Sequence, residues 1–395
     1  MFHYLTFILL LLFSLPSFAV IPLDNGHLTE MESDSDKIIS YKHQEHMWVT
    51  ADGALHMMIK YNIGMSLYSS FDQGKTWQEM LATQGIEQPA SSDGVWVCDY
   101  LYTVYSTQQG NIGVAKLHYD KENKTWSAIS QQTVETGPDV TATRPTITAD
   151  SSGRLWVAFP ANHILIQRKY IRVYYSQDEG TSWQDSGMRL GTENAKDKAA
   201  RILALSDRIG IIYSDNDRKD AIGRWAYRMN DWPFEQAWQD QEIGRHPYKY
   251  FQDPLGTHYN VVVDNTNNIH VTSSDAGELV YFRYDSHTQA WESPTVVDQI
   301  QKTAYTQLSI TPDNRIFLIH NSGVNVIILM SQNQGKTFEP YAQLTPPALK
   351  NISFLFPRVE TPSISDGKTL HVLLQAQEKG IFGQKVLLHY AVPTE

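Results

Sequence analysis

The sequence has few of the features that mark several common classes of protein. Cys98 is the only cysteine among its 395 residues, so an internal disulfide is excluded and stability must come from packing. A lone cysteine is more typical of a buried thiol than of a nucleophile, and we expect Cys98 to be buried. No apolar run after residue 19 approaches the ~20 residues of a membrane helix. Helical periodicity, Gly-rich phosphate loops and paired-cysteine metal sites are also missing from the pattern.

The net charge and the first 19 residues indicate which partners and which cellular location to expect. Acidic side chains outnumber basic ones by 43 to 32, which gives a formal net charge of −11. This excess argues against nucleic acid or an anionic membrane as the main partner, although a local basic pocket could bind an anion. Residues 1–19 have a short apolar core and end in small residues, which predicts a cleaved secretory signal. The segment has no Lys or Arg, so an uncleaved N-terminal anchor is the alternative. We expect a secreted or periplasmic monomer with no membrane span after cleavage.

One eight-residue pattern occurs three times, at Ser70–Trp77, Ser176–Trp183 and Ser331–Phe338. In each copy an Asp or Asn lies two residues before a glycine, and an aromatic residue ends the pattern. Such an acceptor side chain can bind backbone N–H groups in a tight turn, and the glycine can take a positive φ. Each copy therefore predicts a strand–turn–strand hairpin whose aromatic residue anchors the next strand in the core.

The copies are spaced by multiples of one length. Asp72 and Asp178 are 178 − 72 = 106 residues apart, and Asp178 and Asn333 are 333 − 178 = 155 apart. Both spacings fit a unit of about 52 residues, a period typical of propeller blades. Weaker copies fill the gaps, and the aromatic series is Trp77, Trp126, Trp183, Trp238, Trp291, Phe338 and Tyr390. We predict an all-β fold, a β-propeller of seven four-stranded blades, with six as the alternative count. Residues 37–395 would form this single domain, and residues 20–36 a polar lead-in able to close the ring.

The repeated pattern resembles the Asp box of the sialidase and BNR-repeat family. This resemblance covers nearly the whole chain after residue 19 and implies a propeller of that superfamily. In that family the boxes lie away from the active site, so the resemblance directs the search for a site to other residues.

The innermost strands of a propeller line its central channel, and ligands usually bind where these strands begin. Counting nine residues back from each first turn gives a polar set: Gln44, Arg144, His258, Tyr305 and Arg358. Close neighbours add His43, Glu45, His46, Lys302 and Glu360. Aligning Pro362 with Pro145 instead would replace Arg358 by Thr361, so the last register stays open.

Two arginines in this set suit a carboxylate, because the planar guanidinium can bind both oxygens. A tyrosine beside them can act as nucleophile or base. The arrangement is similar to that of sialidases, in which arginines clamp the substrate carboxylate and a tyrosine–glutamate pair does the covalent chemistry. The resemblance implies a glycoside hydrolase in which Arg144 and Arg358 form the clamp and Tyr305 is the nucleophile. Glu360 or Glu45 would be the partner of Tyr305.

Two other functions fit the same residues. A seven-bladed relative with a His, Tyr and Arg site looks like the propeller-type polysaccharide lyases, in which Arg neutralises a uronate carboxylate. Tyr305 or His258 would then abstract the adjacent proton. A non-catalytic glycan-binding or protein-binding propeller is the third alternative, because fold does not dictate function. For both the hydrolase and the lyase hypothesis the substrate is an anionic glycan, and Gln44, His46 and Lys302 would be further binding residues.

The stretch His43-Gln44-Glu45-His46 contains three residues of metal-binding types, two histidines and one glutamate. Residues three apart on a strand face opposite sides, so the two histidines cannot share a metal without a bulge. We therefore expect neither a metal nor a cofactor.

Overall fold

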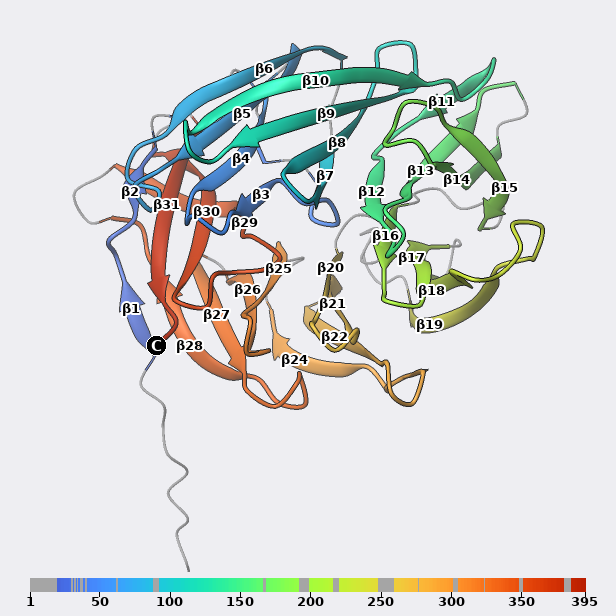
Figure 1. The fold of residues 1–395 in the computed structure, drawn as a ribbon. Helices are drawn as coiled ribbons and strands as arrows, with labels where there is room; N and C mark the ends of the chain where they lie inside the picture. Colours follow the sequence, from blue (N-terminus) through green and yellow to red (C-terminus); the bar gives the residue numbers. More distant parts are fainter. Residues whose placement is uncertain are drawn as a thin grey trace, which may run out of the picture.

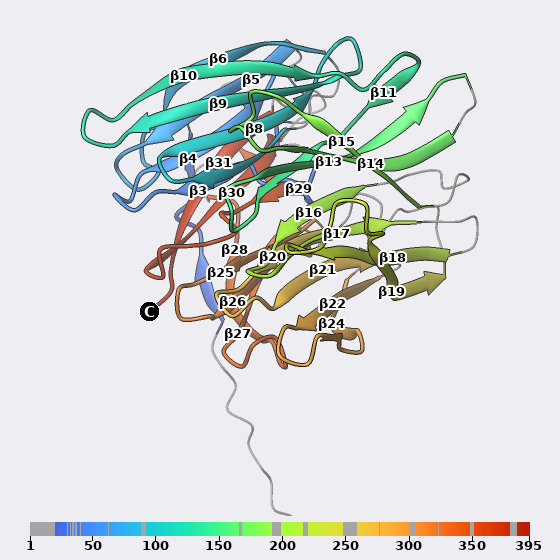
Figure 2. The same cartoon turned by 45° about the vertical axis from the view of Figure 1, so that its right-hand side comes forward.

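The computed structural model describes residues 20–29, 31, 33, 35, 38–39, 41–61, 63–87, 92–165, 168–191, 199–215, 220–247, 259–275, 277–300, 305–322, 324–347, 351–379 and 385–395. These residues form strands and turns, and they contain no helix, hence none that could cross a membrane. The strands make seven separate sheets arranged around one axis (Figure 1), and the turned view in Figure 2 shows the same ring obliquely. The prediction of a seven-bladed β-propeller is confirmed.

Each blade is an antiparallel meander that runs from the innermost strand outward. The first three blades are β3 (Met47–Val49), β4 (Leu55–Lys60), β5 (Ile63–Ser70) and β6 (Gln78–Glu87); β7 (Ser92–Val97), β8 (Tyr100–Ser106), β9 (Ile112–Asp120) and β10 (Thr125–Val134); and β12 (Thr146–Ala149), β13 (Leu155–His163), β14 (Arg168–Ser176) and β15 (Gln184–Leu190), where β11 (Val140–Ala142) also pairs with β13.

The next blades keep this order. They are β16 (Ala200–Ala204), β17 (Arg208–Ser214), β18 (Asp220–Met229) and β19 (Gln239–Pro247); β20 (Tyr259–Val263), β21 (Ile269–Asp275), β22 (Glu278–Asp285) and an outer edge divided between β23 (Ala290–Trp291) and β24 (Thr295–Gln299); β25 (Thr306–Ile310), β26 (Ile316–Ser322), β27 (Asn325–Ser331) and β28 (Glu339–Leu344); and finally β29 (Ile352–Glu360), β30 (Thr369–Glu378) and β31 (Lys385–Pro393).

The seventh blade takes its outermost strand from the other end of the chain. β2 (His27–Leu28) pairs antiparallel with β31, with His27 opposite His389. β1 (Ile21–Leu23) lies parallel to β28 and adds a fifth strand to the sixth blade (Figure 1). The N-terminal segment thus joins the ring at two neighbouring blades. Tyr390, which ends the aromatic series, accordingly lies in a third strand and not in an outermost one.

The repeated motif forms the turn that its sequence predicts. In the second copy, the Ser176 hydroxyl accepts from the Gly180 N–H at 2.9 Å, and Asp178 accepts from the Ser182 N–H at 2.9 Å. Hydrogen bonds from the Ser182 hydroxyl and N–H lower the pKa of Asp178 to about 2. Gly180 has φ of 86°, a conformation open to glycine at little cost. The indole of Trp183 donates to the Gly180 carbonyl at 3.1 Å, which ties the aromatic anchor to the turn.

The core of the described structure is divided into seven apolar clusters, each between two neighbouring blades. The cluster between the seventh and first blades, for example, joins Leu373 and Leu387 to Met57 and Trp77. Fully burying a large apolar side chain stabilises the fold by about 1.5–3 kcal/mol, so every blade depends on both neighbours. Cys98 was expected in such a core and that expectation is wrong. It is exposed in the turn between β7 and β8, where its φ is 55°.

Candidate functional site

The central channel has two ends, which we name by the direction of the innermost strands. These strands begin at the start end and finish at the finish end. Residues 41–46, which we call the central segment, cross the channel before β3. Lys42, His43, Gln44 and His46 within it are almost fully buried. The channel is therefore filled by polar side chains, and the two ends present separate surfaces.

Tyr305 immediately precedes β25 at the start end and has two cations against its ring. The Lys42 ammonium lies 3.9 Å from the ring centroid, and the Arg358 guanidinium carbon lies 5.0 Å from it. Asn321 on β26 fixes the backbone of Tyr305, because its side chain accepts from the Tyr305 N–H and its N–H donates to the Tyr305 carbonyl. Arg358 is held in turn by a 2.8 Å hydrogen bond to the Ile39 carbonyl.

A second cation–aromatic pair lies at the same end, on the third blade. The Arg144 guanidinium carbon lies 5.2 Å from the centroid of Tyr41, the residue next to Lys42. Arg144 has φ of 50°. A positive φ is unfavourable for a residue other than glycine, and Pro145 further restricts the backbone of the residue before it to extended conformations. Such strain persists only where the surroundings impose it, and it is common at functional positions. The central segment thus joins Arg144 on one side to Tyr305 on the other.

The middle of the channel is a closed network of hydrogen bonds. Glu360 is 1% exposed; one oxygen accepts from the His46 N–H at 3.3 Å, and the other lies 3.1 Å from His46 Nδ1. Gln307 donates to the second oxygen at 3.3 Å. Gln44 donates to the Pro145 carbonyl at 2.7 Å. These groups fasten the central segment to the inner strands, so they hold the channel together.

Glu45 faces the other end of the channel. Its carboxylate accepts from the Ser363 N–H at 3.3 Å and lies 3.5 Å from Arg201 Nη2. Arg201 also binds Asp93, which is fully buried and accepts from the Glu45 N–H at 2.7 Å. Burial outweighs the attraction of Arg201 and raises the pKa of Glu45 to about 7, with repulsion from Asp93 and Glu360 adding to the effect.

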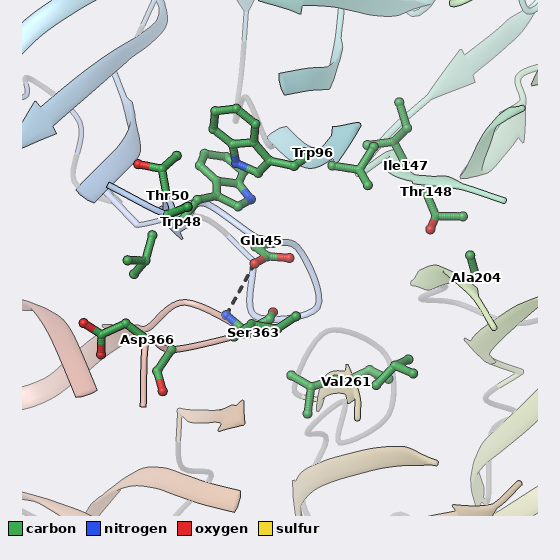
Figure 3. Close-up of a pocket in the computed structure, with 18 of the residues that line it drawn as sticks. Glu45, Trp48, Thr50, Trp96, Ile147, Thr148, Ala204, Val261, Ser363 and Asp366 are labelled. Carbon is green, nitrogen blue, oxygen red and sulfur yellow. Dashed lines mark hydrogen bonds between the residues drawn. The ribbon is translucent and has the colours of Figure 1, made fainter. Parts of the chain in front are cut away.

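A cavity of about 920 Å³ opens above Glu45 at the finish end (Figure 3). Its walls are the last residues of the inner strands, such as Thr148, Leu203 and Val262, together with two tryptophans. Gln73, from the turn of the first Asp box, also lines it. The boxes and this cavity therefore share one end, and the Tyr305 cluster lies at the other.

The predicted site residues fall into three groups. Arg144, Tyr305 and Arg358 lie at the start end, where Arg358 contacts Tyr305 and Arg144 contacts Tyr41 on the other side of the central segment. Gln44, His46 and Glu360 form the buried network, and Glu45 lines the cavity at the finish end. His258 and Lys302 lie outside the described residues. Within the described part of the chain, no group of three or more metal-binding side chains could hold a metal ion.

Three further residues at these sites were not predicted from the sequence. Lys42 directly precedes the His43–His46 stretch, but residues before the first strand carry no repeat register that could single it out. Asp93 and Arg201 begin the second and fourth blades, whose first turns contain neither the glycine nor the asparagine from which the register is counted, so their register is hard to assign. Their positions at the beginning of inner strands would have been the usable signal.

Comparisons with known proteins show the fold alone. No protein-family profile and no curated protein sequence matches the chain. Among solved structures, an ulvan lyase of polysaccharide lyase family PL25, bound to a glucuronate–sulfated-rhamnose unit, superposes with a TM-score of 0.55 at 11% identity. This match covers 90% of this chain and 96% of the lyase. The polysaccharide lyase Uly1 gives 0.53 at 12% identity, covering 89% of this chain and 90% of that protein.

A sialidase from Trypanosoma rangeli gives a lower TM-score of 0.48 at 12% identity, over 76% of this chain and 54% of the sialidase. The chain is therefore a seven-bladed β-propeller with the same fold as these polysaccharide lyases.

Proposed function

We propose that this protein is a secreted polysaccharide lyase that cleaves an anionic, uronate-containing glycan at the start end of the channel. The observation that carries the proposal is the placing of Lys42 and Arg358 against the ring of Tyr305. Two positive charges beside a phenol provide the two functions of β-elimination, which are neutralisation of a carboxylate and a positioned base. The fold shared with ulvan lyase supports the same chemistry.

The proposed step removes the proton from C5 of the uronate, next to its carboxylate. Arg358 binds the carboxylate and stabilises the negative charge that develops on it. The Tyr305 phenolate takes the C5 proton, the electron pair forms the C4=C5 double bond, and the C4–O bond to the neighbouring sugar breaks. Tyr305 then passes the proton to the departing oxygen, which leaves Tyr305 as it began.

A sialidase-type hydrolase is the second candidate, and the presence of Arg144 and Arg358 at one end supports it. That mechanism needs a carboxylate beside the nucleophile. Both oxygens of Glu360 are already bound within the buried network, and Glu45 faces the opposite end. The engagement of these two carboxylates elsewhere is the reason that we prefer the lyase.

The test is the incubation of purified protein with uronate polysaccharides, beginning with a glucuronate–sulfated-rhamnose polymer, and in parallel with a fluorogenic sialoside. The lyase predicts ultraviolet absorbance from the unsaturated product and no fluorescence. Tyr305→Phe should abolish the absorbance, whereas Tyr341→Phe, which removes the hydroxyl of an outer-strand tyrosine, should leave it unchanged. Fluorescence that depends on Tyr305 would support the hydrolase. Activity that survives Tyr305→Phe would exclude both mechanisms.

A further inference from the structure

The cavity at the finish end has a composition unlike that of the Tyr305 cluster. Its wall combines valine, isoleucine and leucine side chains at the ends of the inner strands with polar and charged groups around them. At its floor is the Glu45 carboxyl group, whose side chain remains 17% exposed. Trp48 and Trp96, which pack in one apolar cluster, also line the cavity (Figure 3). Its volume of about 920 Å³ is within the range of small-molecule sites, which is roughly 300–1,000 Å³.

The negative charge of Glu45 is only partly neutralised by its neighbours. Arg201 is the nearby cation, and it is shared, because one guanidinium nitrogen binds Asp93 and the other lies 3.5 Å from Glu45. Asp93 and Glu360 add further negative charge behind Glu45. The remaining charged groups that line the cavity are Asp52, Asp366 and Lys368. A positive group on a ligand would therefore gain more at Glu45 than a neutral or a negative group.

Trp96 favours the same type of ligand, because it is the more exposed of the two tryptophans, whereas Trp48 is 5% exposed and packs in the apolar cluster between the first two blades. The face of an indole ring attracts organic cations, with a gain of about 0.5–2 kcal/mol that increases as the cation loses water. Trp48 is held in place by its packing on Gly94, where an added Cβ would come within 2.6 Å of the indole. A metal ion fits less well, because Ca²⁺ takes about 6–8 oxygen ligands and no group of three or more metal-binding side chains among the described residues could hold one.

We propose that the finish-end cavity binds an organic ammonium ion with an apolar or aromatic body. The ammonium group would pair with Glu45 on the side of Trp96, and the body would lie against Ile202, Leu203 and Val262. The preference is opposite in sign to that of the start end, where Lys42 and Arg358 favour anions. The molecule would therefore carry two sites of opposite charge preference on one axis.

The test is calorimetric titration of the purified full-length protein at low salt and about pH 8. The probes are phenethylammonium, the neutral 2-phenylethanol and the anionic phenylacetate, which share one aromatic body. We expect the ammonium to bind at least about tenfold more tightly than the alcohol, as one ion pair gained would give, and phenylacetate not to bind. Equal affinity for ammonium and alcohol, or no binding of the ammonium, would overturn the proposal.

Two variants locate the site. Glu45→Gln should abolish the preference for the ammonium over the alcohol, whereas Glu122→Gln, in an exposed hairpin, should keep it. Ile364→Lys is the second variant, at a rim position that is 63% exposed and so tolerant of substitution. Its added ammonium should weaken binding of the cation and leave the alcohol unaffected. Retention of the full preference in both variants would place the binding elsewhere and refute the assignment.

Discussion

His371 Nδ1 lies 3.1 Å from His389 Nε2, and the two imidazole rings are stacked with centroids 5.2 Å apart. They belong to β30 and β31, so they lie in the blade that closes the ring. Burial lowers the pKa of His371 from 6.5 to about 4, and burial together with repulsion from His371 lowers the pKa of His389. His27 from β2 packs edge-on against His389.

These pKa shifts predict acid sensitivity. Between about pH 6.5 and pH 4 the unfolded chain binds protons that the folded chain does not, so stability falls as the pH decreases. His371 alone contributes a loss of about 3 kcal/mol over this window. Denaturant midpoints at about pH 7, 5.5 and 4.5 would measure the slope. His371→Gln should flatten it and the exposed His287→Gln should not, and equal slopes in all three proteins would contradict the prediction.

Glu45 should make stability depend on pH in the opposite direction. Its pKa is raised from 4.5 to about 7, so from pH 4.5 to 7 the folded chain binds more protons and stability falls as the pH rises. Glu45→Gln removes the charge and should stabilise the protein by up to about 3 kcal/mol at pH 8. At about pH 4.5 the two proteins should unfold at similar denaturant concentrations. A Gln variant that is less stable than wild type at pH 8 would show that the negative charge is well compensated.

The Asp-box glycines provide a matched pair. Gly180 and Gly335 have φ of 86° and 83°, so alanine at either position costs about 1–2 kcal/mol in backbone strain. An added Cβ at Gly180 would meet its nearest atom at 3.5 Å, whereas at Gly335 it would overlap the buried ring and hydroxyl of Tyr281. Gly335→Ala should therefore be the more destabilising by about 1–3 kcal/mol. Thermal unfolding of the two variants measures the difference, and similar midpoints would disprove the packing argument.

The N-terminal strands should differ in their effect on stability. A chain that begins at Asp24 lacks β1 but keeps β2, and its sixth blade still has four strands. A chain that begins at Glu30 lacks both, which leaves the edge of β31 unpaired and removes a quarter of the closing blade. We expect the longer deletion to lower the melting temperature much more and to promote aggregation, measured by calorimetry and light scattering. Equal melting temperatures would mean that β2 does not stabilise the closure.

Arg358 should contribute to the transition state of the proposed lyase. Arg358→Gln is expected to lower kcat/KM for the uronate polymer by about 10²-fold or more, and Arg358→Lys by less, because lysine keeps the charge without the bidentate fork. Arg315→Gln serves as the control, since Arg315 follows the first turn of the sixth blade and pairs with Asp313. A loss confined to KM would instead assign Arg358 to ground-state binding.

The fold could be predicted because its determinants are local and repeated. Each Asp box fixes a turn through its own side chains, and the regular spacing of Trp77, Trp183 and Phe338 sets the number of blades. The sequence indicated that residues 20–36 could close the ring, but it could not show which of them pair with the last blade, because that pairing joins His27 to His389 across the whole chain.

The candidate site could be predicted in part. The positions of Arg144, Tyr305 and Arg358 at the start end could be predicted because their blades have regular first turns, while their role in a site stays a prediction. Gln44, His46 and Glu360 were assigned to a ligand because they are polar, but in the channel polar side chains bond to one another and are buried. A network that joins the central segment to the third, sixth and seventh blades leaves no mark on any single repeat.

The pairing of β2 with β31 also sets an order of events during synthesis. β2 leaves the ribosome long before its partner β31, so the ring must stay open until β31 has also been synthesised. Inner blades can pack on neighbours as they emerge, but the first blade lacks one neighbour throughout that time. The exposed flank of the first blade is thus the surface that a chaperone would have to protect until the chain is released.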